Sequence, residues 1–278
     1  MNSSLHRISG FAALALAGAV LASPALADGM RGSLKDTPKP EERRCSLAGN
    51  VALTTDYVFR GYSQTSEGAA VQGGFDATCG IFYAGVWASS LNWDAAFDAE
   101  WASVEMDWYA GIKPKTGRIT WDLGVIYYSY PNSNKLLGVD NTYFELKVGG
   151  STEIWKDGTF GVTVFYSPDY QYETGSVWTA EASFSQALPK MGMFTPTFSA
   201  LVGYQQGDDT SYKALFGNLD DSYWYWNAGV TLGFHEKWSL DLRYWDTSLG
   251  DNSGGNGYCK GPAFQCDERF VATAKITY

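Results

Sequence analysis

The strongest constraint on the fold is a strict alternation of apolar and polar residues that recurs along most of the chain. It is clearest at the C-terminus, where Phe270, Ala272, Ala274, Ile276 and Tyr278 alternate with Arg269, Thr273, Lys275 and Thr277. The same pattern runs through residues 51–60, 103–113, 223–232 and 238–244. Strict alternation over about nine residues is typical of a β-strand with two unlike faces. The sequence therefore predicts an all-β protein.

Weaker segments bring the expected number of strands to twelve. They are predicted at residues 50–60, 69–79, 81–90, 101–113, 118–129, 142–150, 159–167, 177–187, 194–204, 222–233, 238–247 and 268–278. The connections alternate between short turns and longer segments rich in Asp, Asn, Gly and Ser, and only residues 151–158 depart mildly from this rule. An even number of antiparallel strands with short turns at one end and long loops at the other is typical of an outer-membrane β-barrel. The short turns, and both termini, would then be periplasmic.

The N-terminus has the features of a secretory signal peptide. Arg7 supplies a positive charge, residues 11–21 are apolar, and Ala25-Leu26-Ala27 fits a cleavage site. A retained anchor helix is the alternative, but the apolar stretch is short for a membrane span. We predict a signal peptide at residues 1–27, a charged periplasmic leader at 28–45 and a transmembrane β-barrel at 46–278.

Aromatic residues decide between a membrane barrel and a water-soluble β-sandwich, which also alternates. On the apolar faces they gather at both ends of the expected strands, with mostly aliphatic residues between. The expected aromatic girdle comprises Phe59, Trp121, Tyr127, Phe144, Phe160, Tyr166, Trp178, Phe194, Tyr204, Trp224, Trp238, Tyr244 and Tyr278. Two such rings are expected at the two interfaces of a bilayer.

The opposite faces carry more charge than a dry core would tolerate. The side chains predicted to line a water-containing pore are Asp56, Arg60, Glu105, Asp107, Asp122, Glu145, Lys147, Glu181, Asp241, Arg243, Arg269 and Lys275. Seven of these are acidic and five are basic, and rings of charge set ion selectivity in channels. The chain as a whole has a formal charge of −10 and no basic stripe, which disfavours nucleic-acid binding.

The four cysteines test the predicted topology. An exported protein can oxidise them, and three pairings are possible on paper. Cys45 and Cys79 would both be periplasmic, whereas Cys259 and Cys266 share the last outer loop. Only the pairs 45–79 and 259–266 avoid bridging roughly 30 Å of membrane. Free thiols remain the alternative.

Motifs for catalysis or cofactor binding are not apparent. His235 is the single histidine after the signal peptide, and it falls in a short turn, where it cannot serve a site facing outward. No G-x-S-x-G, P-loop or H-E-x-x-H motif occurs. Residues 208–209 and 251–256 could offer oxygen ligands to Ca²⁺, but they lack EF-hand spacing and read as solvated loops. We predict no enzyme, no metal and no cofactor, although paired carboxylates of a glycosidase type are not ruled out by spacing.

Several segments resemble the TorF-type porin family of exported proteobacterial proteins. The resemblance is carried by NVALTTDYVFRGYSQT at 50–65, VQGGFDA at 71–77, FYAGVWASSLNW at 82–93, EMDWY at 105–109, VIYYSYP at 125–131 and NTYFELKVG at 141–149. It is clear over residues 50–150 and loose beyond them. The C-terminal strand also resembles the signal that the barrel-insertion machinery reads. The resemblance implies an outer-membrane location and a pore, and it carries over no catalytic residues.

The sequence therefore predicts a porin-like channel for small polar solutes or ions with a weak preference for cations. Expected partners are outer-membrane lipid, lipopolysaccharide and the barrel-insertion machinery. Arg60 is expected near the outer mouth, paired with Asp56 or with a carboxylate of a neighbouring strand, either at a constriction or in a structural bridge at the rim. The alternative function is a closed barrel that acts as a structural or adhesive surface protein through its loops.

Overall fold

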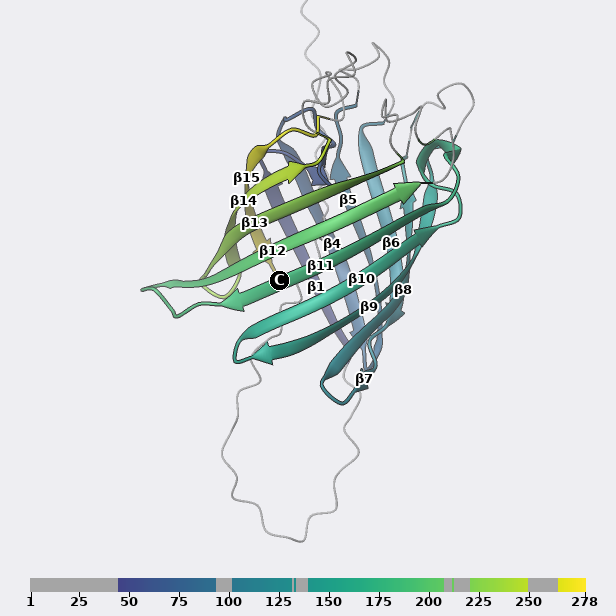
Figure 1. Ribbon diagram of the computed structural model, residues 1–278. Helices are drawn as coiled ribbons and strands as arrows, with labels where there is room; N and C mark the ends of the chain where they lie inside the picture. The colour runs from purple at the N-terminus through teal and green to yellow at the C-terminus, as the bar shows by residue number, and fades with distance from the viewer. Residues whose placement is uncertain are drawn as a thin grey trace, which may run out of the picture.

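The computed structural model is a closed barrel of twelve long antiparallel strands (Figure 1). It describes residues 45–93, 102–131, 133, 140–207, 212, 221–249 and 265–278. The wall consists of β1 (Cys45–Thr54), β4 (Ala70–Cys79), β5 (Phe82–Ser90), β6 (Val104–Ile112), β8 (Ile119–Ser129), β9 (Tyr143–Trp155), β10 (Gly158–Ser167), β11 (Val177–Ala187), β12 (Phe194–Gly207), β13 (Ser222–Phe234), β14 (Trp238–Thr247) and β15 (Arg269–Thr277). Each wall strand pairs with the next one along the chain, and β1 pairs with β15 to close the ring. The predicted all-β antiparallel barrel is confirmed.

Four shorter elements complete the described structure. They are β2 (Val58–Phe59), β3 (Tyr62–Ser63), β7 (Lys115–Thr116) and a 3₁₀ turn, η3 (Gln171–Glu173). β2 and β3 pair only with each other and so stand apart from the wall. No helix in the described part of the chain is long and apolar enough to span a membrane.

The predicted bounds are wrong for two strands. The first strand begins at Cys45 and leaves the wall after Thr54, so residues 55–60 do not continue it. The sixth extends to Trp155 and is followed by a turn of only two residues, 156–157. Residues 151–158 are therefore no exception to the alternation of short turns and long loops. All connections at that end span two to six residues, whereas those at the other end span nine or more.

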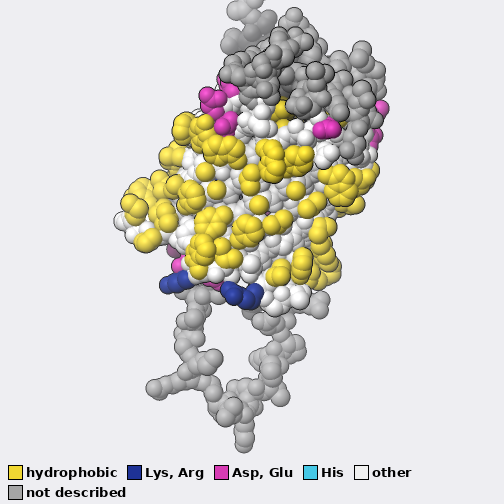
Figure 2. All heavy atoms as spheres, viewed as in Figure 1, with side chains coloured by type: hydrophobic (Ala, Val, Ile, Leu, Met, Phe, Trp, Pro, Cys, Tyr) yellow, Lys and Arg dark blue, Asp and Glu magenta, His cyan; other side chains and the backbone are white. Residues whose placement is uncertain are grey.

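The outer surface of the barrel is apolar over its whole girth. Large hydrophobic side chains are exposed along the strands, among them Leu53, Phe75, Val148 and Phe270. Figure 2 shows this yellow band on one face, with Asp and Glu near the loop end and Lys and Arg near the turn end. A continuous apolar surface of this extent is a surface for contact with lipid or protein rather than with water.

Most of the residues predicted for the aromatic girdle lie on this outer surface. Trp121, Tyr127, Phe144, Phe160, Trp178, Phe194, Trp224, Trp238 and Tyr278 are exposed. Tyr166, Tyr204 and Tyr244 pack beside exposed rings of the adjacent strands. The prediction that Phe59 belongs to the aromatic girdle is wrong. Because the chain has already left the wall there, its ring lies inside the barrel, 5.8 Å from the ring of Tyr128.

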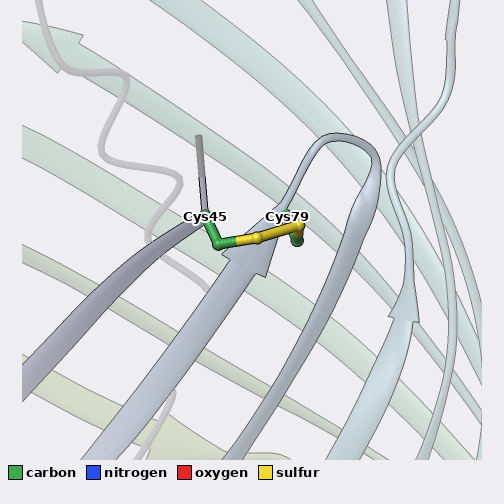
Figure 3. Close-up of a disulfide and its surroundings, with 2 residues drawn as sticks. All are labelled: Cys45 and Cys79. Carbon is green, nitrogen blue, oxygen red and sulfur yellow. A yellow bond between two sulfur atoms is a disulfide. The ribbon is translucent and has the colours of Figure 1, made fainter. Parts of the chain in front are cut away.

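A disulfide joins Cys45 to Cys79, as predicted (Figure 3). The two residues are direct partners in the β1–β4 ladder. β1 pairs with β15 only from Asn50 onward, so residues 45–48 have a strand neighbour on one side alone. The disulfide fastens this one-sided end of β1. Cys266 is also disulfide-bonded, and Cys259, its expected partner, lies outside the described residues.

We expect loss of the Cys45–Cys79 disulfide to act locally. In the variant with Cys45→Ser and Cys79→Ser, the amides of residues 46–48 should exchange faster, because only the β4 ladder then holds them. Chain-entropy arguments limit the loss in unfolding free energy to about 4 kcal/mol. Hydrogen exchange read by mass spectrometry checks this. Faster exchange throughout β1 and β15 would show instead that the disulfide maintains barrel closure.

Candidate functional site

The interior of the barrel divides into a filled half near the long loops and a more open half near the short turns. Buried aromatic side chains occupy the loop-side half. They come from the wall and from the loops, namely Tyr57, Tyr62, Trp87, Trp93, Tyr128, Tyr130, Tyr143, Tyr170, Tyr172, Tyr212, Tyr223 and Tyr225. Many sit edge to face or stacked on one another, as aromatic rings prefer. This part of the lumen is therefore packed like a protein core.

A short hairpin folded into the lumen completes this packing. We call residues 57–65, which contain β2 and β3, the luminal hairpin. Its two-residue turn is formed by Arg60 and Gly61, which both have positive φ, 49° and 89°. Positive φ at both positions is the requirement of a tight type I′ hairpin, which favours glycine at the second position. At Gly61 a side chain would also collide with Thr247.

Arg60, at the tip of the luminal hairpin, is bound on several sides. Its guanidinium donates to both carboxylate oxygens of Glu145 on β9, at 2.6 and 2.8 Å. Phe59 and Phe165 flank it, with ring centroids 4.8 and 5.0 Å from the guanidinium carbon. The backbone oxygen of Arg60 accepts a hydrogen bond from the hydroxyl of Tyr223 on β13. The hairpin is thus tied to strands on different sides of the ring.

The Arg60–Glu145 pair is one of the most buried ion pairs of the described structure, with side-chain exposures of 4% and 1%. Burial alone lowers the pKa of Arg60, but Glu145 more than offsets this and raises it well above its ordinary value. The guanidinium is therefore permanently charged. Arg60 was predicted to pair with Asp56 or with a carboxylate of a neighbouring strand. It pairs with neither, because the turn carries Arg60 across the lumen to β9, which is not a neighbour of β1.

Asp56 forms a second buried pair at the base of the hairpin. Its carboxylate lies 3.0 Å from the guanidinium of Arg269 on β15. It also accepts hydrogen bonds from the hydroxyls of Ser63 and Thr65, at 2.6 and 2.8 Å. Asp56 therefore links the two arms of the hairpin to each other and to the wall.

The polar side chains toward the turn end are only partly buried. Asp122 accepts from Lys147 and from the hydroxyl of Tyr83, each at 2.7 Å. Asp241 and Arg243 are paired at 2.9 Å, with exposures of 22% and 15%. These side chains face inward but retain contact with solvent. The turn-side half is therefore lined by polar side chains that solvent can reach.

The residues predicted from sequence to line a pore all lie inside the barrel, although in different surroundings, and Asp56 and Arg60 belong to the segment that leaves the wall after Thr54. Asp56, Arg60, Glu105, Asp107, Glu145 and Arg269 are buried in the filled half. Asp122, Lys147, Glu181, Asp241, Arg243 and Lys275 are partly exposed. The structure joins Asp56 with Arg269, Arg60 with Glu145, and Asp122 with Lys147.

Sequence reasoning missed Asp76 and the inward tyrosines. Asp76 on β4 accepts a hydrogen bond from Tyr109 at 2.5 Å. The alternation around Asp76, between Phe75 and Ala77, was a usable signal, but Gly73 and Gly74 obscured it. The tyrosines gave no comparable signal, because a tyrosine suits a lipid interface and a packed lumen equally well.

Among the described residues, no group of three or more His, Cys, Asp or Glu side chains is placed to hold a metal ion. A small cavity remains beside the luminal hairpin. It is lined by Phe59, Arg60, Tyr62, Gln64, Tyr170, Gln171, Gln205 and Tyr223. Its polar groups are amides, phenols and the guanidinium of Arg60, which is paired with Glu145.

A twelve-stranded barrel with an apolar exterior and a charged, partly filled lumen has the architecture of a transmembrane β-barrel. The chain belongs to the Gcw_chp family, described as bacterial proteins of unknown function, whose family model matches residues 41–278. No curated protein matches the sequence.

Among solved structures, the fold is similar to that of the KdgM porin, with a TM-score of 0.53 and 8% identity over 83% of this chain and 98% of that one. A second structure, the KdgM porin in complex with disordered oligogalacturonate, gives a TM-score of 0.50 with 7% identity, over 84% and 98% of the two chains. At such identities the similarity concerns the fold.

We expect Arg60→Ala to be the most destabilising single change in the lumen, because it leaves Glu145 buried without a cation. Breaking a buried pair from one side costs about 3–5 kcal/mol. Chemical unfolding in detergent micelles measures the loss. The double variant with Arg60→Met and Glu145→Leu removes both charges and should recover most of it.

Lys113→Ala is the matched control. Lys113 pairs with Asp122 at 3.7 Å and is 49% exposed, so its loss should cost less than about 1 kcal/mol. Equal effects of Arg60→Ala and Lys113→Ala would contradict a locking role for Arg60.

Proposed function

We propose that this protein is an outer-membrane channel of the porin type, with an outer constriction formed by the luminal hairpin. The observation that carries the proposal is the contrast between the two faces of one wall. The outward face is apolar, whereas the inward face carries paired charges that remain partly solvated toward the turn end. A polar path through an apolar layer is the arrangement that diffusion channels need.

The proposed location is the bacterial outer membrane, reached through the signal peptide at residues 1–27. The short turns would face the periplasm and the long loops the outside. Lipopolysaccharide and membrane lipid would contact the apolar band, and the insertion machinery would engage the C-terminal strand. The resemblance of residues 50–150 to TorF-type porins supports the same assignment.

The proposed cargo is small, polar and weakly selected for positive charge. Asp76 adds an eighth inward carboxylate to the seven predicted ones, against five basic side chains. Because several of these charges cancel in pairs, the remaining field is mildly negative. We therefore propose passage of small polar solutes and ions, with cations preferred.

The filled loop-side half makes conduction depend on the hairpin. We expect the refolded protein to give discrete but small conductance steps in a planar bilayer, with a reversal potential in a salt gradient that indicates mild cation preference. Replacing residues 57–65 by two glycines removes the luminal hairpin and should increase conductance severalfold. Val148→Ala, on the outer face of β9, is the control and should leave conductance unchanged.

One observation favours a second candidate function. The aromatic cluster and the luminal hairpin fill the loop-side half so completely that the barrel could be permanently closed. It would then serve as a structural or adhesive surface protein through its outer loops. A folded protein that conducts neither intact nor without the hairpin would rule out the channel and favour this role.

The membrane assignment has its own test. Val148 lies near the middle of β9 and is 54% exposed, whereas Trp155 ends that strand and is 55% exposed. In a bilayer, Val148→Arg should cost about 2–4 kcal/mol, and Trp155→Arg less than about 1 kcal/mol, because the cost of a charge depends on depth. Unfolding of the barrel in lipid vesicles measures both. Equal costs would contradict a membrane centred on the barrel wall.

A further inference from the structure

Two buried carboxylates in the loop-side half have no cation. Glu105 and Asp107 occupy alternate positions of β6, so both face inward, and they are only 3% and 9% exposed. Elsewhere in this half the buried carboxylates are neutralised, Glu145 by Arg60 and Asp56 by Arg269. Across the described residues, neither Glu105 nor Asp107 forms an ion pair with a Lys or Arg.

The hydrogen bonds of Asp107 are also incomplete. Glu105 accepts from the hydroxyl of Tyr57, at 2.6 Å, and from that of Tyr130. Oδ1 of Asp107 is buried and has no hydrogen-bond partner. Trp87, the direct partner of Asp107 in the β5–β6 ladder, has an indole N–H that is likewise without an acceptor. An unpartnered carboxylate oxygen at this depth indicates that a cation or a bound proton neutralises these carboxylates.

A positive charge is needed to stabilise Glu105 and Asp107 in this buried position. Two ionised carboxylates on alternate residues of one strand, both out of water, would repel each other and lose most of their hydration energy. A bound proton removes one of the charges and needs no cavity. A metal ion would need several more oxygen ligands, and no such group of acidic side chains is found in the described structure.

We propose that Glu105 and Asp107 form a proton-binding dyad that binds one proton in total and keeps the luminal hairpin closed. The part of the proposal that concerns gating rests on the proposed channel function. The proton comes from bulk water and returns to it on opening, so no other reactant is involved.

The groups that face the dyad explain why it, rather than its neighbours, should titrate. They are Trp87 from β5, Tyr109 from β6 itself, Tyr128 and Tyr130 from β8 and its outer end, Glu145 from β9, and Tyr57 and Arg60 from the hairpin. Arg60 is fully committed to Glu145. Burial, followed by the charges of Glu105 and Asp107, raises the pKa of Tyr57 and Tyr130 well above the ordinary value. Both phenols therefore keep their protons.

The dyad is linked to the hairpin through the hydroxyl of Tyr57. Loss of the bound proton would place a second negative charge in the packed cluster, which water must then enter and hydrate. In an open, hydrated state the carboxyl groups would titrate near their ordinary pKa of about 4. The closed state therefore binds more protons than the open state, so rising pH favours opening and falling pH favours closure.

Infrared spectroscopy tests the proton directly. At neutral pH the refolded protein should show the carbonyl stretch of a protonated, buried carboxylic acid, shifted in D₂O. Asp107→Asn and Glu105→Gln should each abolish it, because the remaining carboxylate then ionises beside a neutral amide. Glu181→Gln is the matched control. Glu181 also faces inward and accepts from one tyrosine, Tyr225, at 2.6 Å, but it is partly exposed. This variant should retain the band.

Conductance as a function of pH tests the gate. Open probability should rise with pH in the native protein and lose this dependence in Asp107→Asn, whose neutral amide mimics the protonated acid and should keep the barrel folded and closed. If the infrared band is present but the protein conducts at no pH, the proton-binding dyad stands and the channel function is contradicted. Absence of the infrared band overturns the dyad. The dyad is also overturned if, at constant pH, opening differs between sodium and a bulky organic cation, because a bound cation rather than a proton would then neutralise the carboxylates.

Discussion

Closure of the ring by backbone hydrogen bonds is the constraint on which the other features depend. β1 and β15 lie at opposite ends of the sequence, yet five residue pairs and reciprocal hydrogen bonds between Gly49 and Tyr278 join them. In hydrocarbon an unpaired strand edge would leave several backbone groups without partners, each at a cost of several kcal/mol. Once the edge is gone, every wall residue must face either lipid or lumen, and this gives the chain its two-residue alternation.

Closure with twelve strands creates a second problem, because the ring is wider than its own inward side chains can fill. The chain solves it differently at the two ends. Toward the turns, pairs such as Asp122 and Lys147 stay partly hydrated. Toward the loops, the luminal hairpin and the tyrosine cluster fill most of the lumen. Tyrosine suits this position, because its ring supplies packing area while its hydroxyl can reach a carboxylate, as Tyr57 and Tyr225 do.

These two solutions explain how far the sequence could be understood by itself. The wall was predictable because alternation is a local pattern that closure imposes on every strand, and the Cys45–Cys79 pairing followed from the topology. The luminal hairpin was not, because residues 55–60 keep the period-two pattern of β1 after they leave the wall. Local periodicity also cannot reveal contacts across the lumen. Arg60 and Glu145 are 85 positions apart, and only the turn at Arg60 and Gly61 brings them together.

In the gating that we propose, the same polar contacts make closure by the luminal hairpin reversible. A core of aliphatic residues would gain from exclusion of water alone, and nothing in solution could reverse it. Here the hairpin is held by buried charges whose mutual attraction is largely offset by the hydration they lose. Arg60, Glu145, Asp56 and Arg269 would all be well solvated in an open lumen. The closed and hydrated states can therefore lie within a few kcal/mol of each other, and one proton at Glu105 and Asp107 is then enough to change which state prevails.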